Sequence, residues 1–195
     1  MPDIKHFDPD AALERIERLF WARGAAATSI QDVAAATGLN RSSLYATFGG
    51  KQRLYRAALE RYLRERAGPA SRALAADPRG LPAVREFFDG LIDVRCAGEF
   101  AGWGCMVVNA HAGVERTDPE VRRLLDAHHR ELREALATAL ATASALGQLG
   151  RDASPEALAE TLTLLAYGVN LRSRAGDDAG ALRRTVGATL AALAR

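Results

Sequence analysis

The stretch that decides the fold runs from Thr28 to Phe48 and reads TSIQDVAAATGLNRSSLYATF. Thr28 begins a capping-box pattern, S/T-x-x-E/Q, which predicts the start of a short helix. Gly38 favours a left-handed end for that helix, and Asn40 is a good N-cap for a second helix that continues to Phe48. Two short helices joined by a glycine-containing turn predict a helix-turn-helix motif at about residues 29–48.

The second helix of this motif carries side chains suited to contact DNA. Leu44 and Phe48 are its inward anchors, which leaves the other positions exposed. Hydroxyl groups there can hydrogen-bond phosphate oxygens, methyl groups can contact thymine, and a guanidinium can fork onto guanine or neutralise a phosphate. A lysine at the start of the following helix can reach the DNA backbone. The predicted DNA contacts are Thr28, Arg41, Ser42, Ser43, Tyr45, Ala46, Thr47 and Lys51.

Helical periodicity continues through almost the whole chain, and no segment alternates as a strand should. One helix is expected before the motif, from Asp8-Pro9 to Gly24, and another after it, from Lys51 to Gly68-Pro69. Further helices are expected at about 82–96, 103–112, 119–146, 155–169 and 178–193. The sequence therefore predicts an all-α protein of about nine helices.

The charge of the chain is distributed unevenly along its 195 residues, although the formal total is only +2. Residues 38–66 hold seven basic and two acidic side chains, whereas residues 67–195 are nearly neutral, with 15 basic and 16 acidic ones. A basic segment ahead of a near-neutral body is typical of a nucleic-acid-binding unit with an appended module. On charge alone, an arginine-rich solvated helix face is an equal alternative.

A linker-like composition separates the two parts. The stretch from Gly68 to Pro82 contains Asp77-Pro78-Arg79-Gly80, a sequence that favours a turn. We therefore expect two domains: residues 1–66, a three-helix helix-turn-helix DNA-binding domain, and residues 67–195, a larger helical body.

Other function classes lack their sequence signatures. No stretch approaches the roughly 18 uncharged apolar residues that a membrane span needs. The chain contains neither G-x-S-x-G nor G-x-x-x-x-G-K-[ST], and Cys105 and His111 would lie on different faces of one helix. The histidines have none of the usual metal-ligand spacings. We therefore expect no enzyme activity, no cofactor, no metal site and no membrane partner.

The motif and its flanks resemble the DNA-binding domain of TetR-family transcriptional regulators. In that family the pattern runs T-(S/T)-(V/I)-x-x-(I/V)-A, then G-V-S-(K/R)-G-(T/S)-L-Y-x-x-F-x-x-K-x-x-L. This sequence follows the pattern at the same spacing with Thr28-Ser29-Ile30, Val33-Ala34, Gly38-Leu39-Asn40-Arg41-Ser42-Ser43-Leu44-Tyr45, Phe48, Lys51 and Leu54. Ser42 replaces a frequent Gly, and Ala46-Thr47 stands where members often carry His or Tyr, so the base preference does not transfer.

The resemblance implies a cytoplasmic repressor whose helical body binds a small-molecule inducer and pairs two copies through the last two helices. Independently, a palindromic DNA operator requires a symmetric homodimer that presents two recognition helices. Ala157, Gly168 and Ala188 are small enough for close helix approach, although packing within one monomer is an alternative. The competing interpretation of the whole chain is a helical protein–protein adaptor whose basic N-terminal unit binds an acidic partner.

The segment from Gly102 to Asn109 is the most distinctive part of the helical body, and it resembles the Gly-Cys-(Leu/Met)-(Val/Leu) segment of one subgroup of the family. Aromatic and apolar side chains with a few polar groups are typical of ligand cavities, and plain core packing is the alternative. The candidate ligand-binding residues for an apolar or aromatic inducer are Phe87, Phe88, Phe100, Trp103, Cys105, Met106, Asn109, His111, Tyr167 and Asn170.

The two cysteines, Cys96 and Cys105, are too few for a disulfide scaffold and fit a reducing cytoplasm. Cys105 is also a candidate redox or electrophile sensor with Cys96 as its resolving partner. That role needs an exposed thiol with a lowered pKa, so a buried, inert thiol is the favoured interpretation.

Overall fold

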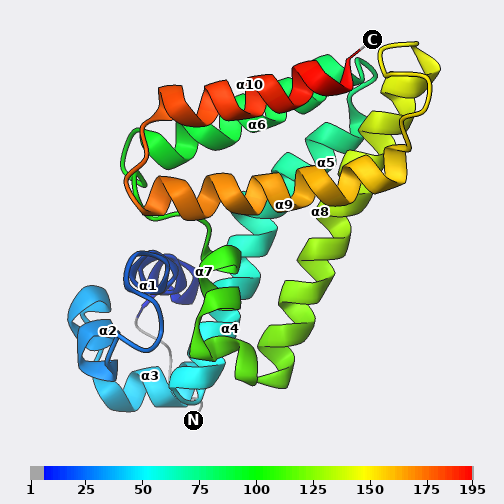
Figure 1. The fold of residues 1–195 in the computed structure, drawn as a ribbon. Helices are drawn as coiled ribbons and strands as arrows, with labels where there is room; N and C mark the ends of the chain where they lie inside the picture. The colour runs from blue at the N-terminus through cyan, green and yellow to red at the C-terminus, as the bar shows by residue number, and fades with distance from the viewer. Residues whose placement is uncertain (1–6, 195) are drawn as a thin grey trace.

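The structure is a computed structural model that describes residues 7–194, and these residues are helical almost throughout (Figure 1). The helices are α1 (Pro9–Arg23), α2 (Ile30–Thr37), α3 (Arg41–Phe48), α4 (Lys51–Tyr62), α5 (Gly68–Ala76), α6 (Leu81–Cys96), α7 (Met106–Ala112), α8 (Pro119–Ala145), α9 (Pro155–Arg174) and α10 (Ala179–Leu193). The predicted all-α fold is confirmed. Residues 1–6 and 195, the outer ends of the two predicted domains, lie outside the described residues.

Most helix starts follow the sequence signals. The side chains of Asp8, Asn40, Asp118, Ser154 and Asp178 each accept a backbone N–H of the first helical turn. Helix α2 differs, because its capping box is formed one residue later than predicted. Its cap is Ser29, whose hydroxyl accepts the Asp32 amide at 3.1 Å while the Asp32 carboxylate accepts the Ser29 amide at 2.7 Å.

The predicted linker is wrong in its first half, because the chain stays helical there. Helix α4 continues into a π-helical turn, Leu63–Ala67, and then directly into α5. Pro69 lacks an amide proton and its ring crowds the preceding turn, and a widened π turn is a local geometry that accommodates both. The true break comes at Gly80, whose φ of 70° lies in the left-handed region.

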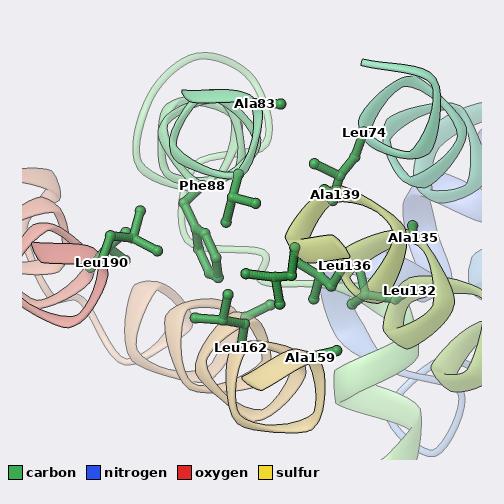
Figure 2. Close-up of a cluster of buried hydrophobic side chains, with 14 of the residues drawn as sticks. Leu74, Ala83, Phe88, Leu132, Ala135, Leu136, Ala139, Ala159, Leu162 and Leu190 are labelled. Atoms are coloured by element: carbon green, nitrogen blue, oxygen red, sulfur yellow. The ribbon is translucent and has the colours of Figure 1, made fainter. Parts of the chain in front are cut away.

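Two hydrophobic clusters hold the helices together. One lies between α6, α8, α9 and α10, where Phe88, Leu136, Leu162 and Leu190 are buried against one another (Figure 2). The other joins α1–α4 to α7 and the first turns of α8, which contribute residues such as Met106. The N-terminal helices therefore share their core with the helical body.

The two ends of the molecule carry different elements. Helices α2 and α3 lie at one end, α6 and α10 lie at the opposite end, and the continuous α4–α5 helix runs between them (Figure 1). No helix in the described part of the chain is long and apolar enough to cross a membrane. A feature on α3 is thus far from the α6–α10 core but is connected to it through α4–α5 and through α8, which contributes residues to both clusters.

Candidate nucleic-acid interface and ligand cavity

Helix α3 is fixed to the N-terminal cluster by very few side chains. Leu44 is its one fully buried residue, and Phe48 is half-buried against the same cluster. Asn40 caps the helix, with its side-chain oxygen accepting the Ser43 amide at 2.7 Å. One buried leucine and a side-chain cap orient the helix and leave most of its surface to solvent.

Seven of the predicted DNA contacts lie on the exposed part of α3 and at the start of α4. Tyr45 has 51% of its surface exposed. Arg41, Ser42 and Ala46 are also exposed, and Ser43, Thr47 and Lys51 are half-buried. Because positions one turn apart share a helix face, Arg41 and Tyr45 lie on one face of α3, and Ser42 and Ala46 lie on the adjacent face.

Thr28 is a correction to the predicted set. Its side chain is completely buried, and its hydroxyl donates to the Gly24 carbonyl at 2.7 Å. The hydroxyl therefore completes the turn between α1 and α2. It has no route to a phosphate in this conformation.

Two carboxylates from the turn between α7 and α8 fasten the N-terminal helices to the body. The Glu115 carboxylate accepts the Ala25 amide at 3.0 Å in the loop before α2. The Asp118 carboxylate accepts both the Nε and an Nη of Arg56 on α4, at 2.8 and 2.6 Å. Sequence analysis missed these contacts, because each joins residues that are more than 60 positions apart.

An open groove of about 560 Å³ lies between α5 and α6, and a smaller cavity of about 70 Å³ lies deeper, toward α7, α8 and α9. Of the predicted ligand-binding residues, Phe87 and Phe100 line the groove. Phe87, Cys105, Tyr167 and Asn170 line the deeper cavity. The structure thus brings together half of the predicted ligand set.

The other five predicted ligand residues lie outside both cavities, because packing or hydrogen bonding commits their side chains elsewhere. Phe88 is buried in the α6–α10 cluster and Met106 in the N-terminal cluster. Trp103 contacts the Trp21 ring at 5.3 Å between centroids. Asn109 donates to the Trp103 carbonyl, and the His111 ring lies 5.7 Å from that of Tyr167.

Arg95 is a cavity-lining residue that the sequence did not indicate. It has only 7% of its surface exposed and lines both the groove and the deeper cavity. Its Nε donates to the Asn170 side-chain oxygen at 2.6 Å, and an Nη donates to the Tyr62 hydroxyl at 3.0 Å. That hydroxyl donates in turn to the Cys105 sulfur at 3.4 Å. A buried cation therefore stands where the two cavities meet.

Cys105 and Cys96 occupy different environments. Cys105 is buried and lines the deeper cavity. Cys96 is half-buried at the end of α6, its sulfur 4.0 Å from the Asp177 carbonyl, and burial raises the pKa of its thiol. Neither thiol has the exposure that a redox sensor needs.

A buried carboxylate connects the cavity wall to α1. Glu17 on α1 is completely buried and accepts from Arg61 at 2.6 Å and from Arg66 at 2.5 Å. Arg66 lies over the Phe100 ring, 4.6 Å from its centroid, and lines both cavities. A molecule that occupies the cavities would therefore touch a residue that holds α1 in place.

Comparison with known proteins adds two matches to family descriptions. Residues 12–58 match "Bacterial regulatory proteins, tetR family", and residues 80–189 match "Tetracyclin repressor-like, C-terminal domain". Together the two matches include α3 and the helices α6 to α9, and they leave out α5 between residues 58 and 80.

Individual relatives match over nearly the full length. The chain is 28% identical over 187 residues to the HTH-type transcriptional repressor ComR of Escherichia coli (strain K12), covering 95% of this chain and 89% of the relative. It is 28% identical over 190 residues to the HTH-type transcriptional regulator YezE of Bacillus subtilis (strain 168), covering 97% of each. A solved structure of the TetR family transcriptional regulator CifR, a cysteine mutant complexed with 26-base-pair operator DNA, is 27% identical with a TM-score of 0.86. That alignment covers 98% of this chain and 99% of CifR.

Proposed function

Because this chain belongs to the TetR family of bacterial transcriptional regulators, we propose that it is a ligand-responsive repressor that binds a palindromic operator as a homodimer. A small-molecule inducer then releases the DNA. The observation that carries this proposal is the exposed face of α3, where Arg41 and Tyr45 face solvent on a helix anchored by one buried leucine. ComR is named a repressor, and CifR is bound to operator DNA.

The proposed DNA interface consists of seven of the eight predicted residues. Arg41 would contact guanine or phosphate, and Ser42, Ser43 and Tyr45 would donate to phosphate oxygens. Ala46 and the Thr47 methyl would contact thymine, and Lys51 would neutralise the backbone next to the α4 N-terminus. Thr28 is left out of this interface because its hydroxyl is buried.

An uncovered stripe on α9 supports the homodimer. Leu164 and Leu171 have 58% and 57% of their surfaces exposed, unusually high values for leucines that share a helix face. Ala157 is exposed on the same helix, and a Cβ added at Gly168 between the two leucines would meet no atom of this chain within 4 Å. Ala188 on α10 is exposed too. A second copy packed on this stripe would bury the leucines across a two-fold axis.

The inducer is proposed to act by shifting the molecule between two conformations. Residues 1–66 would bind DNA, and residues 67–195 would bind the ligand and the second copy. The contacts of Glu115 with Ala25 and of Asp118 with Arg56 are among the connections between them. A ligand that binds more tightly to the conformation in which the α3 helices of the two copies are wrongly spaced would weaken operator binding. The size of this effect is limited by the difference between the ligand's affinities for the two conformations. The site of action would be the cytoplasm.

Fluorescence anisotropy with DNA from the promoter region beside the protein's own gene tests this function. Wild-type protein should bind that DNA in the presence of excess nonspecific competitor, and Arg41→Ala should weaken binding by about tenfold or more. Arg151→Ala, an exposed arginine in the loop before α9, is the matched control and should bind as wild type does. Sequence-independent binding that disappears with salt would contradict the proposal and favour the adaptor alternative.

The dimer is tested separately by light scattering after size-exclusion chromatography. The double variant Leu164→Glu, Leu171→Glu places like charges on the proposed two-fold stripe. It should be a monomer that keeps its helical circular dichroism signal. If the double variant is still a dimer, the dimer interface does not include this stripe of α9.

A further inference from the structure

The buried guanidinium of Arg95 lacks a counter-charge within residues 7–194. Its hydrogen-bond partners there are the neutral Asn170 amide and the Tyr62 hydroxyl. The neighbouring Arg66 and Arg61, by contrast, share the Glu17 carboxylate. A buried cation without an anion costs stability, so such a site favours an anion from outside the chain.

A second unsatisfied group lies in the wall of the same cavity. His128 on α8 has 7% of its surface exposed, and its Nδ1 has no hydrogen-bond partner in the described residues. Burial lowers its pKa to about 4, with His111 and His129 contributing, so the ring is neutral at neutral pH. His128 and Arg95 both line the deeper cavity, whose volume is about 70 Å³. This space admits a small polar head group but no large ring.

The groove outside that cavity has apolar walls. Its sides include Leu74, Phe87, Leu91 and Phe100, and its volume of about 560 Å³ lies within the range of small-molecule sites. Arg95 lines both spaces, so it stands at the inner end of the groove.

Three carboxylates also line the groove or its mouth, but each is paired with an arginine. Asp77 and Glu86 both bind Arg79, at 2.5 and 2.6 Å, and Glu65 binds Arg64 at 2.7 Å. Asp77 and Glu86 share one arginine, so these carboxylates exceed their arginine partners by one charge, but Glu65 and Glu86 are exposed to solvent. Arg95, by contrast, is buried, and no carboxylate contacts it in the described residues.

We propose that the inducer is an apolar carboxylic acid whose carboxylate binds Arg95 and whose apolar body fills the groove between α5 and α6. This inference rests on the proposed function and names the ligand class. A carboxylate can accept two parallel N–H groups of a guanidinium, which a primary amide of the same shape cannot match in charge. Arg66 lines the same spaces, so a bound carboxylate would also compete with Glu17 for Arg66 and loosen α1.

Isothermal titration calorimetry on the full chain without DNA tests the ligand class. Three probes are used, octanoate, benzoate and 2-naphthoate, each with its primary amide. At least one carboxylate should bind saturably and about tenfold or more tighter than its amide. Arg95→Gln should reduce that ratio to about twofold or less, whereas Arg95→Lys, which keeps the charge, should retain part of it. Arg85→Gln, an exposed arginine on the same helix and outside both cavities, is the matched control and should keep the full ratio.

Several outcomes would overturn the proposal. These are saturable binding by none of the three carboxylates, equal binding of acid and amide, or an unchanged ratio in an Arg95→Gln variant whose circular dichroism matches wild type. Operator binding is measured separately by anisotropy. If the ligand-free protein does not bind operator DNA, the proposed function fails while the acid-to-amide ratio is still measured. If the carboxylate binds but does not release the DNA, it is a ligand of the cavity and is not the inducer.

Discussion

The exposed face of α3 and the interior around Arg95 both present a guanidinium to a partner from outside the chain, but in opposite environments. Arg41 lies in water, where its charge is solvated until DNA arrives. Arg95 is buried, where the charge is costly and polar neighbours must hold it. Changes on α3 should therefore alter DNA binding with little effect on stability, whereas changes in the interior should alter stability directly. Four predictions test this contrast, in order of their expected effect on the free energy of unfolding.

The largest effect is expected for Glu17→Ala in the interior. The substitution leaves Arg61 and Arg66, which are both largely buried, without their shared carboxylate. Urea denaturation should show a loss of about 3 kcal/mol. Glu14→Ala, one turn earlier on α1, removes a half-exposed carboxylate and should cost well under about 1 kcal/mol. Equal denaturation midpoints for the two variants would contradict the structural role of Glu17.

The next effect is a pH dependence from His128. Its pKa is about 4 in the folded protein, below the ordinary histidine value of 6.5, so the unfolded chain binds more protons between these two pH values. The protein should lose stability as the pH falls from 6.5 toward 4, by up to about 3 kcal/mol, and should keep this contribution above pH 6.5. His128→Gln cannot titrate and should flatten the dependence measured by denaturant titration at several pH values. The half-exposed His129→Gln should leave the slope nearly unchanged, and a steep slope in His128→Gln would assign the effect to other groups.

A smaller effect is expected on the DNA-facing side, at the cap of α3. Asn40→Ala removes the side-chain oxygen that accepts the Ser43 amide. It should cost about 1 kcal/mol, which lowers the thermal midpoint by roughly 2–4 °C. Gln31→Ala, an exposed residue in the first turn of α2, is the control and should leave the midpoint within about 1 °C. A larger fall in the thermal midpoint for Gln31→Ala than for Asn40→Ala would contradict the stabilising role of the Asn40 cap.

The smallest effect on stability is expected for Tyr45→Phe. The side chain is half-exposed, so removing its hydroxyl should change the free energy of unfolding by less than about 0.5 kcal/mol. Operator affinity should still fall by about fivefold, because one hydrogen bond to phosphate is lost. The salt dependence of binding should stay the same in Tyr45→Phe and become shallower in Arg41→Ala, which loses a charge. Unchanged operator affinity in Tyr45→Phe would remove its hydroxyl from the interface.

The α3 surface could be predicted from the sequence, whereas the interior around Arg95 could not. The α3 site is local: Gly38, Asn40 and Leu44 fix the helix within a few residues of the side chains that it exposes. Periodicity and cap residues therefore predict both the helix and its exposed face. The predicted DNA contact at Thr28 is wrong because the capping box is formed by Ser29, one residue later. The Thr28 hydroxyl instead donates to the Gly24 carbonyl in the turn before α2.

The interior site is assembled from residues on several helices, so no local pattern marks it. On α6 the hydropathy pattern even misleads, since Val94 has 49% of its surface exposed while the adjacent Arg95 is buried. A glutamate is usually expected at an exposed helix position, but Glu17 is buried. Its carboxylate binds Arg61 and Arg66, which follow it by 44 and 49 residues in the sequence. Large apolar side chains suit a ligand cavity and a packed core equally well, so their type alone does not distinguish the two, and Phe88 and Met106 lie in the cores.

The continuous helix from Lys51 to Ala76 has a geometric consequence for the distance between the two sites. Its 26 residues span about 39 Å at 1.5 Å per residue. A tilt of about 5° at the α5 end would displace the α4 end by about 3 Å, close to the spacing of adjacent base pairs along a DNA strand. A rearrangement too small to open the protein core is thus large enough to move a recognition helix out of register with its half-site.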